Sequence, residues 1–464
     1  MASSFLSREN TIAPPGYDRF LVPPAALAVH LSIGQAYAFS TFNLPLTKVL
    51  GITHAAPGDW KLAEVGWTFS IAIVLLGLSA AVFGRWVEQA GPRKSMFVAA
   101  LCFGGGFQIA AIGIHYHQIF LLYLGYGVLG GCGLGIGYIS PVSTLIKWFP
   151  DRPGMATGMA IMGFGGGALI AAPLSLLLME HFKTAISNGV GETFVTMGVM
   201  YFMFMMIGVV SVRVPAADWK PAGWTAAEKP RPLVTTANVS VDVAWRTPQF
   251  WLLWGVLCMN VTAGIGVLGQ ASPMIQEIFA GRVSPAAAAG FVGLLSLFNM
   301  AGRFVWAATS DYVGRRATYM IFFLLGIVLY SLVPTLGHMG SIVLFVGAFA
   351  IIISMYGGGF ATIPAYLRDV FGAMNVGAIH GRLLTAWAMA GVLGPVLVNY
   401  IRQFQIDQGV PRAQAYSITM YIMCGVLLVG FLCNLAMRPV NERHHHRALD
   451  TPTPRDAKKA RQAA

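Results

Sequence analysis

Charged residues are scarce in this chain of 464 residues. Only 10% of the residues are Asp, Glu, Lys or Arg, whereas 56% are hydrophobic. A soluble domain carries about 25% charged residues. A chain this long with so little charge cannot cover a water-facing surface, so lipid is expected to be its main solvent.

Cysteines are also few, and none forms a C-x-x-C pair. All five fall inside apolar stretches, where buried thiols are expected. The sequence therefore offers neither a disulfide framework nor a metal site. Clustered catalytic groups and a phosphate-binding loop are missing too, so we expect neither an enzyme nor a cofactor. The polar amino-terminal residues lack the apolar core of a cleaved signal peptide.

Long hydrophobic runs are what the sequence does contain. A hydrocarbon core about 30 Å thick needs about 20 apolar residues in a helix. These runs predict an all-α membrane protein with twelve transmembrane helices. They lie near 20–44, 64–84, 95–114, 118–140, 154–178, 194–213, 249–270, 287–309, 317–337, 341–364, 379–400 and 415–436.

The basic residues predict the orientation of these helices. With the amino terminus in the cytoplasm, outer segments hold six of the 30 Lys and Arg residues, and Arg303 lies inside a span, which leaves 23 in cytoplasmic segments. This asymmetry follows the positive-inside rule. We therefore expect a multi-pass inner-membrane protein with both termini cytoplasmic. The same asymmetry accounts for the net charge of +12 without a nucleic-acid partner.

Two similar halves are expected on either side of a polar, proline-rich linker. The predicted division is a cytoplasmic tail at 1–19, a six-helix half at 20–213, a linker at 214–247, a second half at 248–438 and a tail at 439–464. The last tail is basic, and we expect it to be solvated and mostly disordered. Binding of this tail to anionic lipid headgroups is the alternative.

Three landmarks recur in the two halves at one offset. Glu88 and Asp311 are 223 residues apart, as are Pro141 and Pro364, and Pro173 and Pro395 are 222 apart. A duplicated six-helix unit favours a carrier in which the halves rock around a site between them. A duplicated channel or membrane enzyme is the alternative.

The repeated loop after the second helix of each half has the pattern G-x-x-x-[DE]-x-x-G-[RK]-[RK]. Residues 84–94 fit it closely, and the second copy has Ala307 in place of the first glycine. The pattern resembles the signature loop of the major facilitator superfamily, in which the acid helps to hold the cytoplasmic side shut. A carboxylate there can accept bonds from a helix amino terminus and pair with arginines; simple positive-inside anchoring is the alternative. The expected latch residues are Glu88, Arg93, Asp311 and Arg315.

Longer strings narrow this resemblance. Residues 34–46 read GQAYAFSTFNLPL, residues 131–158 read GCGLGIGYISPVSTLIKWFPDRPGMATG, and residues 356–372 read YGGGFATIPAYLRDVFG. Together with GRLLTAWAMAGVLGP at 381–395, they resemble the oxalate/formate antiporter family, which is related to the monocarboxylate carriers. The resemblance covers all but the tails and the linker. It implies the major facilitator fold and secondary transport of small carboxylates, by exchange or with protons, in a protein that can work as a monomer.

Arg303 is the one charged residue well inside a predicted span, about 9 Å from its cytoplasmic end. A cation there costs roughly 2.5–3.5 kcal/mol unless it faces a cavity or a partner. None of the 18 acidic residues maps to a mid-span position, so an anionic substrate is the expected partner. The resemblance implies the same role for an arginine on helix 8. The alternative is that Arg303 extends to the cytoplasmic surface and meets Asp311 or lipid headgroups.

A departure from the family narrows the substrate. The family's oxalate carriers have a lysine on helix 11, but no lysine occurs between 379 and 400, and Trp387 lies near its expected place. One arginine balances a monoanion such as formate, lactate or pyruvate and leaves one charge of oxalate uncompensated. We therefore predict a monocarboxylate, with oxalate/formate exchange as the alternative and an anion channel less favoured. Arg382 reaching inward would overturn this preference.

Other polar and aromatic residues in the spans are expected to line the site. They are Gln35, Tyr37, Tyr126, Tyr138, Asn260, Tyr356 and Trp387. The resemblance supports Tyr37, Tyr356 and Trp387 best, Tyr138 falls near the predicted cytoplasmic end, and packing is the alternative for each tyrosine. His30 is the one histidine deep in a predicted span, and either packing or proton coupling accounts for it.

Overall fold

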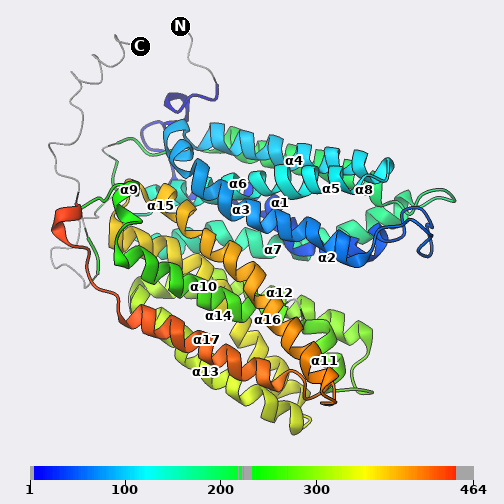
Figure 1. The fold of residues 1–464 in the computed structure, drawn as a ribbon. Helices are drawn as coiled ribbons and strands as arrows, with labels where there is room; N and C mark the ends of the chain where they lie inside the picture. The colour runs from blue at the N-terminus through cyan, green and yellow to red at the C-terminus, as the bar shows by residue number, and fades with distance from the viewer. Residues whose placement is uncertain are drawn as a thin grey trace.

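The computed structural model consists almost entirely of helices (Figure 1). Residues 1–4, part of the predicted linker and the predicted disordered tail from His446 onward lie outside the described residues. The described residues are 5–217, 219–221, 223, 233–235, 237–268 and 270–445.

Twelve spans within the described residues are long and apolar enough to cross a membrane, which confirms the predicted number. The first half contains α1 (Val22–Ile33), α2 (Ser40–Leu46), α3 (Leu62–Ala90), α4 (Pro92–His115), α5 (Ile119–Leu122), α6 (Gly131–Trp148), α7 (Pro153–Phe182) and α8 (Val190–Ser211). A 3-10 segment, Gly34–Ala38, joins α1 to α2, and a π-helical segment, Tyr123–Gly130, joins α5 to α6.

The second half begins after the short helix α9 (Val241–Ala244). It contains α10 (Pro248–Leu268), α11 (Ala271–Ile278), α12 (Pro285–Val313), α13 (Arg315–His338), α14 (Ile342–Phe371), α15 (Val376–Leu383), α16 (Thr385–Asp407) and α17 (Ser417–Leu435). Helices α15 and α16 together form the eleventh span.

Several helices run further than their apolar runs predicted. Helix α3 continues to Ala90 and α12 to Val313, because a helix can extend past the hydrocarbon core on polar residues. Glu88 and Asp311 therefore lie on helices, not in loops as expected. Arg303 is ten residues from the end of α12, about 15 Å at 1.5 Å per residue, and the last part of that length lies beyond the predicted hydrocarbon core.

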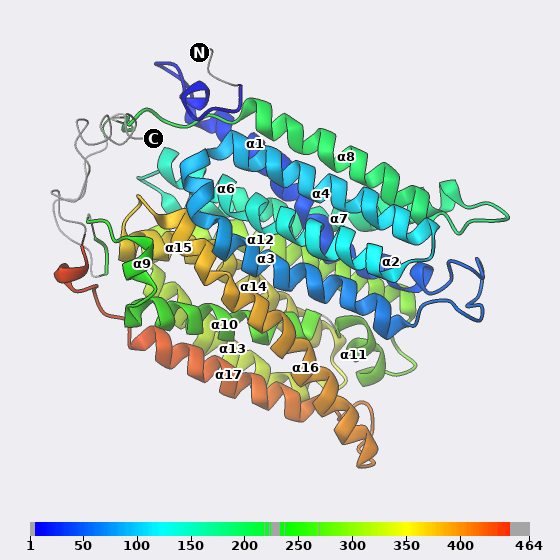
Figure 2. The same cartoon turned by 45° about the horizontal axis from the view of Figure 1, so that its top comes forward.

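The two halves form two lobes, with α1–α8 in one and α10–α17 in the other (Figure 1). The described chain ends and the short helix α9 lie at one end of the bundle, which we call the terminal face. Helix α7 packs on α12 across the lobes, and α3 packs on α15 and α16, as the turned view shows for α3 (Figure 2). The second and fifth spans of each half therefore contact the other half.

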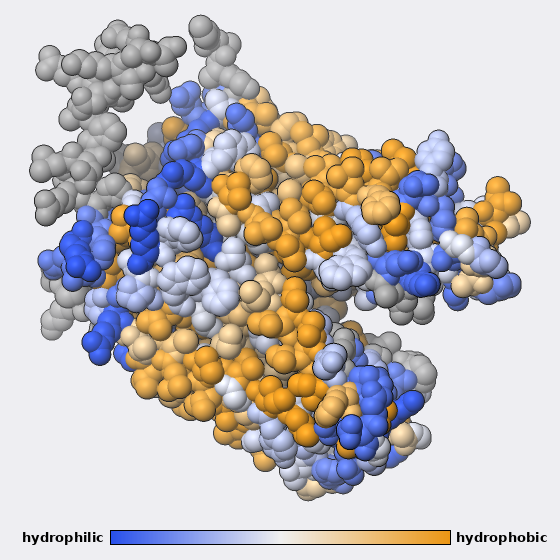
Figure 3. Space-filling model, in the orientation of Figure 1, coloured by the Kyte–Doolittle hydropathy of each residue, from blue (hydrophilic) through white to orange (hydrophobic). Residues whose placement is uncertain are grey.

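The surface separates apolar flanks from polar ends. Figure 3 shows hydrophobic residues over the sides of the helices and hydrophilic residues gathered at both ends, as a bilayer requires. The same view shows the surface deeply hollowed between the lobes at the end opposite to the terminal face. The lobes are therefore closed on each other at one end and open at the other.

Candidate functional site

Arg303 lies between the lobes and is fully buried. Its Nε donates to Asn299 Oδ1 at 3.1 Å, and its Nη1 donates to the carbonyl oxygen of Ile161 at 3.4 Å. Among the residues that the structure describes, its Nη2 has no hydrogen-bond partner. Within the described part of the chain, no ion pair joins it to an acid. A buried guanidinium is thus only partly satisfied by the protein.

Three aromatic rings surround this guanidinium. Its Cζ lies 5.2 Å from the ring centroid of Phe360, 5.7 Å from Phe164 and 6.0 Å from Tyr37. Ring faces attract a cation, and more so where water is excluded, so the rings help to hold the charge. Sequence reasoning predicted only Tyr37 among them. The one sequence feature that could have pointed to Phe164 is its position as a large side chain within a row of glycines in α7.

Trp387 and Tyr138 continue the same cluster. The Trp387 ring lies 4.5 Å from Phe360 and 5.4 Å from both Phe164 and Tyr138. Both side chains are fully buried, and the Trp387 Nε1 and Tyr138 Oη atoms have no hydrogen-bond partner among the described residues. Tyr138 was expected near a helix end, but it is ten residues inside α6, because this helix continues to Trp148.

The remaining predicted residues of helices 1 and 10 meet across the lobes. The hydroxyls of Tyr37 and Tyr356 lie 3.3 Å apart and form a hydrogen bond between the halves. Asn260 of α10 lines a small cavity of about 10 Å³ next to Tyr356.

Two predicted residues, Tyr126 and Gln35, bond to each other within the first half. Tyr126 donates to Gln35 at 3.0 Å, and its ring packs on Phe39 and Phe107 in the core of the first half. The position of Tyr126 is therefore that of a packing residue, which was the alternative interpretation.

His30 is buried entirely within the first half. Its Nδ1 and Nε2 atoms lie 2.6 Å and 3.1 Å from the carbonyl oxygens of Ala160 and Tyr138, and its ring stacks on Tyr138. These partners belong to α6 and α7. Both carbonyl oxygens that contact its ring therefore come from the first half, and the charge of Arg303 acts on it from the other half.

His380 is a second buried histidine, which sequence reasoning missed. It is 1% exposed on α15, at the first turns of the eleventh span. The predicted span began at 379, so this position appeared to lie at the membrane surface. The only sequence signal is a histidine in an otherwise apolar or small stretch, VGAIHG.

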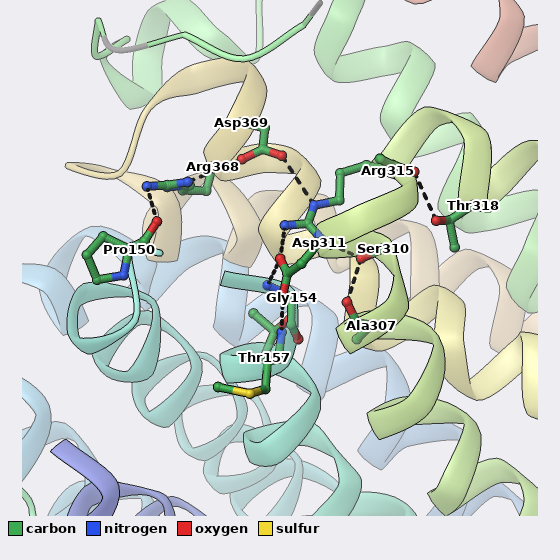
Figure 4. Close-up of polar contacts among 12 residues, drawn as sticks. Pro150, Gly154, Thr157, Ala307, Ser310, Asp311, Arg315, Thr318, Arg368 and Asp369 are labelled. Carbon is green, nitrogen blue, oxygen red and sulfur yellow. Dashed lines mark hydrogen bonds and ion pairs between the residues drawn. The ribbon is translucent and has the colours of Figure 1, made fainter. Parts of the chain in front are cut away.

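Asp311 joins the two halves at the terminal face (Figure 4). Its Oδ1 and Oδ2 atoms each accept, at 2.8 Å, a backbone N–H at the start of α7, from Gly154 and Met155. Arg315 bonds to both Asp311 and Asp369. A Cβ at Gly154 would come within 2.2 Å of the Ala307 carbonyl oxygen, so only glycine allows this approach. The contacts expected of Asp311 and Arg315 are present.

Glu88 makes the corresponding bond from the first half. Its Oε1 accepts the N–H of Gly377, at the start of α15, at 3.0 Å. Its ion-pair partner is Lys147, at 2.7 Å, and not Arg93. Arg93 instead donates to carbonyl oxygens, including those of Phe5 and Val209, because it points toward the amino-terminal segment.

Arg382 does not reach the Arg303 cluster. It pairs with Asp242 at 2.9 Å, donates to the carbonyl oxygen of Val241, and lies over the ring of Trp245. These contacts hold it at the terminal face.

Comparison with known proteins agrees with this architecture. A sequence profile of the Major Facilitator Superfamily matches residues 25–395, and again 268–462. The oxalate:formate antiporter of Oxalobacter formigenes is 28% identical over 377 residues, which cover 81% of this chain and 82% of that protein. The apicoplast pyruvate carrier 1 of Toxoplasma gondii is 22% identical over 443 residues, which cover 84% of this chain and 78% of that protein.

Solved structures share the fold. A proton:xylose symporter superposes with a TM-score of 0.65 at 15% identity, over 91% of this chain and 96% of that one. A bacterial ferroportin homologue in an outward-facing state gives 0.64 at 14% identity, over 89% and 98%. The chain therefore belongs to the Major Facilitator Superfamily and is a transporter.

Proposed function

We propose that the protein is a secondary transporter of a small carboxylate, with Arg303 as the group that binds the carboxylate. The observation that carries this proposal is the fully buried guanidinium whose Nη2 has no partner. Leaving a buried charged donor unsatisfied costs more than the 1–3 kcal/mol of a neutral group. A carboxylate oxygen supplies the acceptor and the opposite charge together.

The neighbouring polar atoms support an anion in the same place. Trp387 Nε1 can only donate a hydrogen bond, and Tyr138 Oη can donate one. Both are buried without a partner, and their rings adjoin each other and the aromatic rings around Arg303. Three unsatisfied donors in one cluster favour a ligand that accepts hydrogen bonds.

The count of charges favours a monocarboxylate of the formate, lactate or pyruvate type. Arg303 is the one cation in the cluster, and Arg382 is already paired with Asp242. A dianion would keep one uncompensated charge in a site of low polarity. Oxalate/formate exchange is the second candidate, because the oxalate:formate antiporter of Oxalobacter formigenes is similar to this chain over 81% of its length.

For the cycle we propose alternating access in the cell's inner membrane, by anion exchange or proton symport. The excess of Lys and Arg at the terminal face supports a cytoplasmic position for that face, and the hollow between the lobes then faces outward. Glu88 and Asp311 act as the latches of the closed cytoplasmic side, because each accepts a bond from a helix start of the other half.

The test is transport by the purified protein in liposomes. Counterflow of labelled formate, lactate, pyruvate and oxalate is measured with and without a pH gradient, in wild type and Arg303→Gln. Losing charged hydrogen bonds worth about 1.5–3 kcal/mol lowers kcat/KM for the monocarboxylate about 10- to 150-fold. Arg282→Gln removes an exposed cation at the opposite face and serves as the matched control.

Each outcome separates the candidates. Saturable counterflow excludes a channel. Oxalate as the preferred substrate, lost in Arg382→Gln, favours the dicarboxylate exchanger over the monocarboxylate carrier. Full activity of Arg303→Gln removes the proposed site.

A further inference from the structure

His380 is a buried ionisable group at the boundary between the lobes, and neither of its ring nitrogens has a hydrogen-bond partner among the described residues. It is 1% exposed, and its ring lies 5.8 Å from that of Tyr138 in the other half. Four residues separate it from the start of α15, so it is about 6 Å below the terminal face. Arg303 and Tyr138 lie about 15 Å below that face, each ten residues from its helix end.

The charged groups on the helices packed against α15 are already paired. Glu88 pairs with Lys147 and also accepts the Gly377 N–H. On α14, Asp369 bonds to Arg315 and Arg368, and α10 carries no charged side chain. The uncharged titratable group against the His380 ring is Tyr138 of α6, and the His30 ring stacks on Tyr138. The α14 tyrosines Tyr356 and Tyr366 bond instead to Tyr37 and Asn434.

The nearest exposed acid is also committed to partners. Asp242 on α9 bonds to both Arg382 and Arg85. These side-chain bonds from Arg382 and Arg85 lower the pKa of Asp242, so it stays ionised at neutral and mildly acidic pH. None of these groups is placed to stabilise a positive charge on His380 while the terminal face is closed.

We propose that His380 is a proton-binding site of the transport cycle, neutral while the terminal face is closed and protonated from that side when the lobes separate there. Burying a charged imidazole without a partner costs free energy, whereas water stabilises the charge. Helices α3 and α6 of the other half pack against α15, and Tyr138 of α6 lies against the His380 ring, so rocking of the halves separates these contacts and admits water.

His30 does not share this property. Both carbonyl oxygens that contact its ring belong to the first half, and a rigid half carries them along. The geometry thus moves the proton-coupling hypothesis from His30 to His380. This inference rests on the alternating-access part of the proposed function and not on the identity of the substrate.

The consequence is a one-sided dependence on pH. A hydrated imidazole has a pKa of about 6.5. Lowering the pH from 7.5 to 5.5 therefore stabilises the state open at the terminal face about tenfold relative to the closed state. The bonds of Glu88 and Asp311 oppose this opening. They therefore set the ratio of closed to open states at neutral pH, and a lower pH shifts that ratio toward the open state.

The test measures the conformational equilibrium directly, without any substrate. Spin labels are placed on the full-length protein at Lys94→Cys and Arg438→Cys, which are exposed at the terminal face in different halves, after the five native cysteines are replaced. Pulsed electron paramagnetic resonance then gives the fractions of short and long distances at pH 7.5 and pH 5.5. We expect the long-distance fraction to gain about tenfold over the short one in wild type.

Variants identify the group that titrates. His380→Gln, or His380→Asn if the first does not fold, abolishes the pH shift, and His30→Gln retains it. The proposal is overturned if wild type shows no shift, if a His380 variant keeps it, or if His30→Gln loses it. Failure to transport carboxylates would contradict the proposed function and leave this result standing, since the measurement needs no ligand.

Discussion

Asp311→Asn is expected to open the terminal face. The carboxylate is 7% exposed and accepts two backbone N–H bonds from the other half, at 2.8 Å each. An asparagine offers one acceptor oxygen, and its amide group faces the second N–H as another donor. One charged hydrogen bond across the lobes is therefore lost, worth about 1.5–3 kcal/mol. At 1.4 kcal/mol per factor of ten, the equilibrium shifts about 10- to 150-fold toward the open terminal face.

The labelled pair at Lys94 and Arg438 measures this shift at pH 7.5. Asp407→Asn is the matched control, because Asp407 ends α16 in an exposed position and accepts only from Gln403 in the same helix. We expect the control to change the populations less than twofold. Equal populations in Asp311→Asn and the control would refute the idea that this carboxylate holds the lobes together.

Two further substitutions test the site. Gly165→Ala is expected to lower transport at least about tenfold, since an added Cβ would lie 3.2 Å from Arg303 Nε and from the Met300 backbone. Gly293→Ala is the control, because a Cβ there meets nothing within 4 Å. Equal rates of labelled counterflow in the two variants would contradict the reasoning. Tyr356→Phe removes the hydroxyl bond to Tyr37 between the halves, a loss of about 0.5–1.5 kcal/mol. It should slow exchange about two- to tenfold, and an unchanged rate would show that this bond does not contribute to the cycle.

The fold was predictable because the bilayer imposes it. Hydrophobic runs of a fixed length and one repeated offset were enough for twelve spans in two related halves. The helix ends were not predictable in the same way. Hydropathy reports where the hydrocarbon core stops, but α3 and α12 continue on polar residues up to Gly91 and Gly314, so Glu88 and Asp311 were assigned to loops.

The site was predictable only where a charge stood out. Arg303 has a large cost in hydrocarbon, and this cost is visible without a structure. Phe164 and Phe360 carry no such cost, since aromatic residues are common in membrane helices, and only the contacts between α7, α12 and α14 bring them to the guanidinium. His380 was hidden by the misplaced start of its span.

The pairing of charged side chains was the feature of the structure that the sequence predicted least well. The pattern in residues 84–94 favoured a pair between Glu88 and Arg93, but the two side chains belong to different helices that diverge at Gly91. Lys147 replaces Arg93 because α6 packs on α3 at this level. Spacing in a loop motif therefore predicts which residues are polar, and tertiary packing decides which of them meet.

The latches and the site share helices, which suggests how binding and opening are linked. Arg303 and Asp311 both lie on α12, and the helix start that Asp311 binds belongs to α7, whose Phe164 packs against the guanidinium. Likewise Glu88 binds the start of α15, which carries His380 one turn later. In the proposed cycle, a shift of α12 along α7 would strain the bonds of Asp311, because Asp311 lies on α12 and the N–H groups that it accepts lie on α7. Separation of α3 from α15 would break the bond of Glu88 and uncover His380, so Arg303 and His380 are both expected to respond to one motion of the lobes.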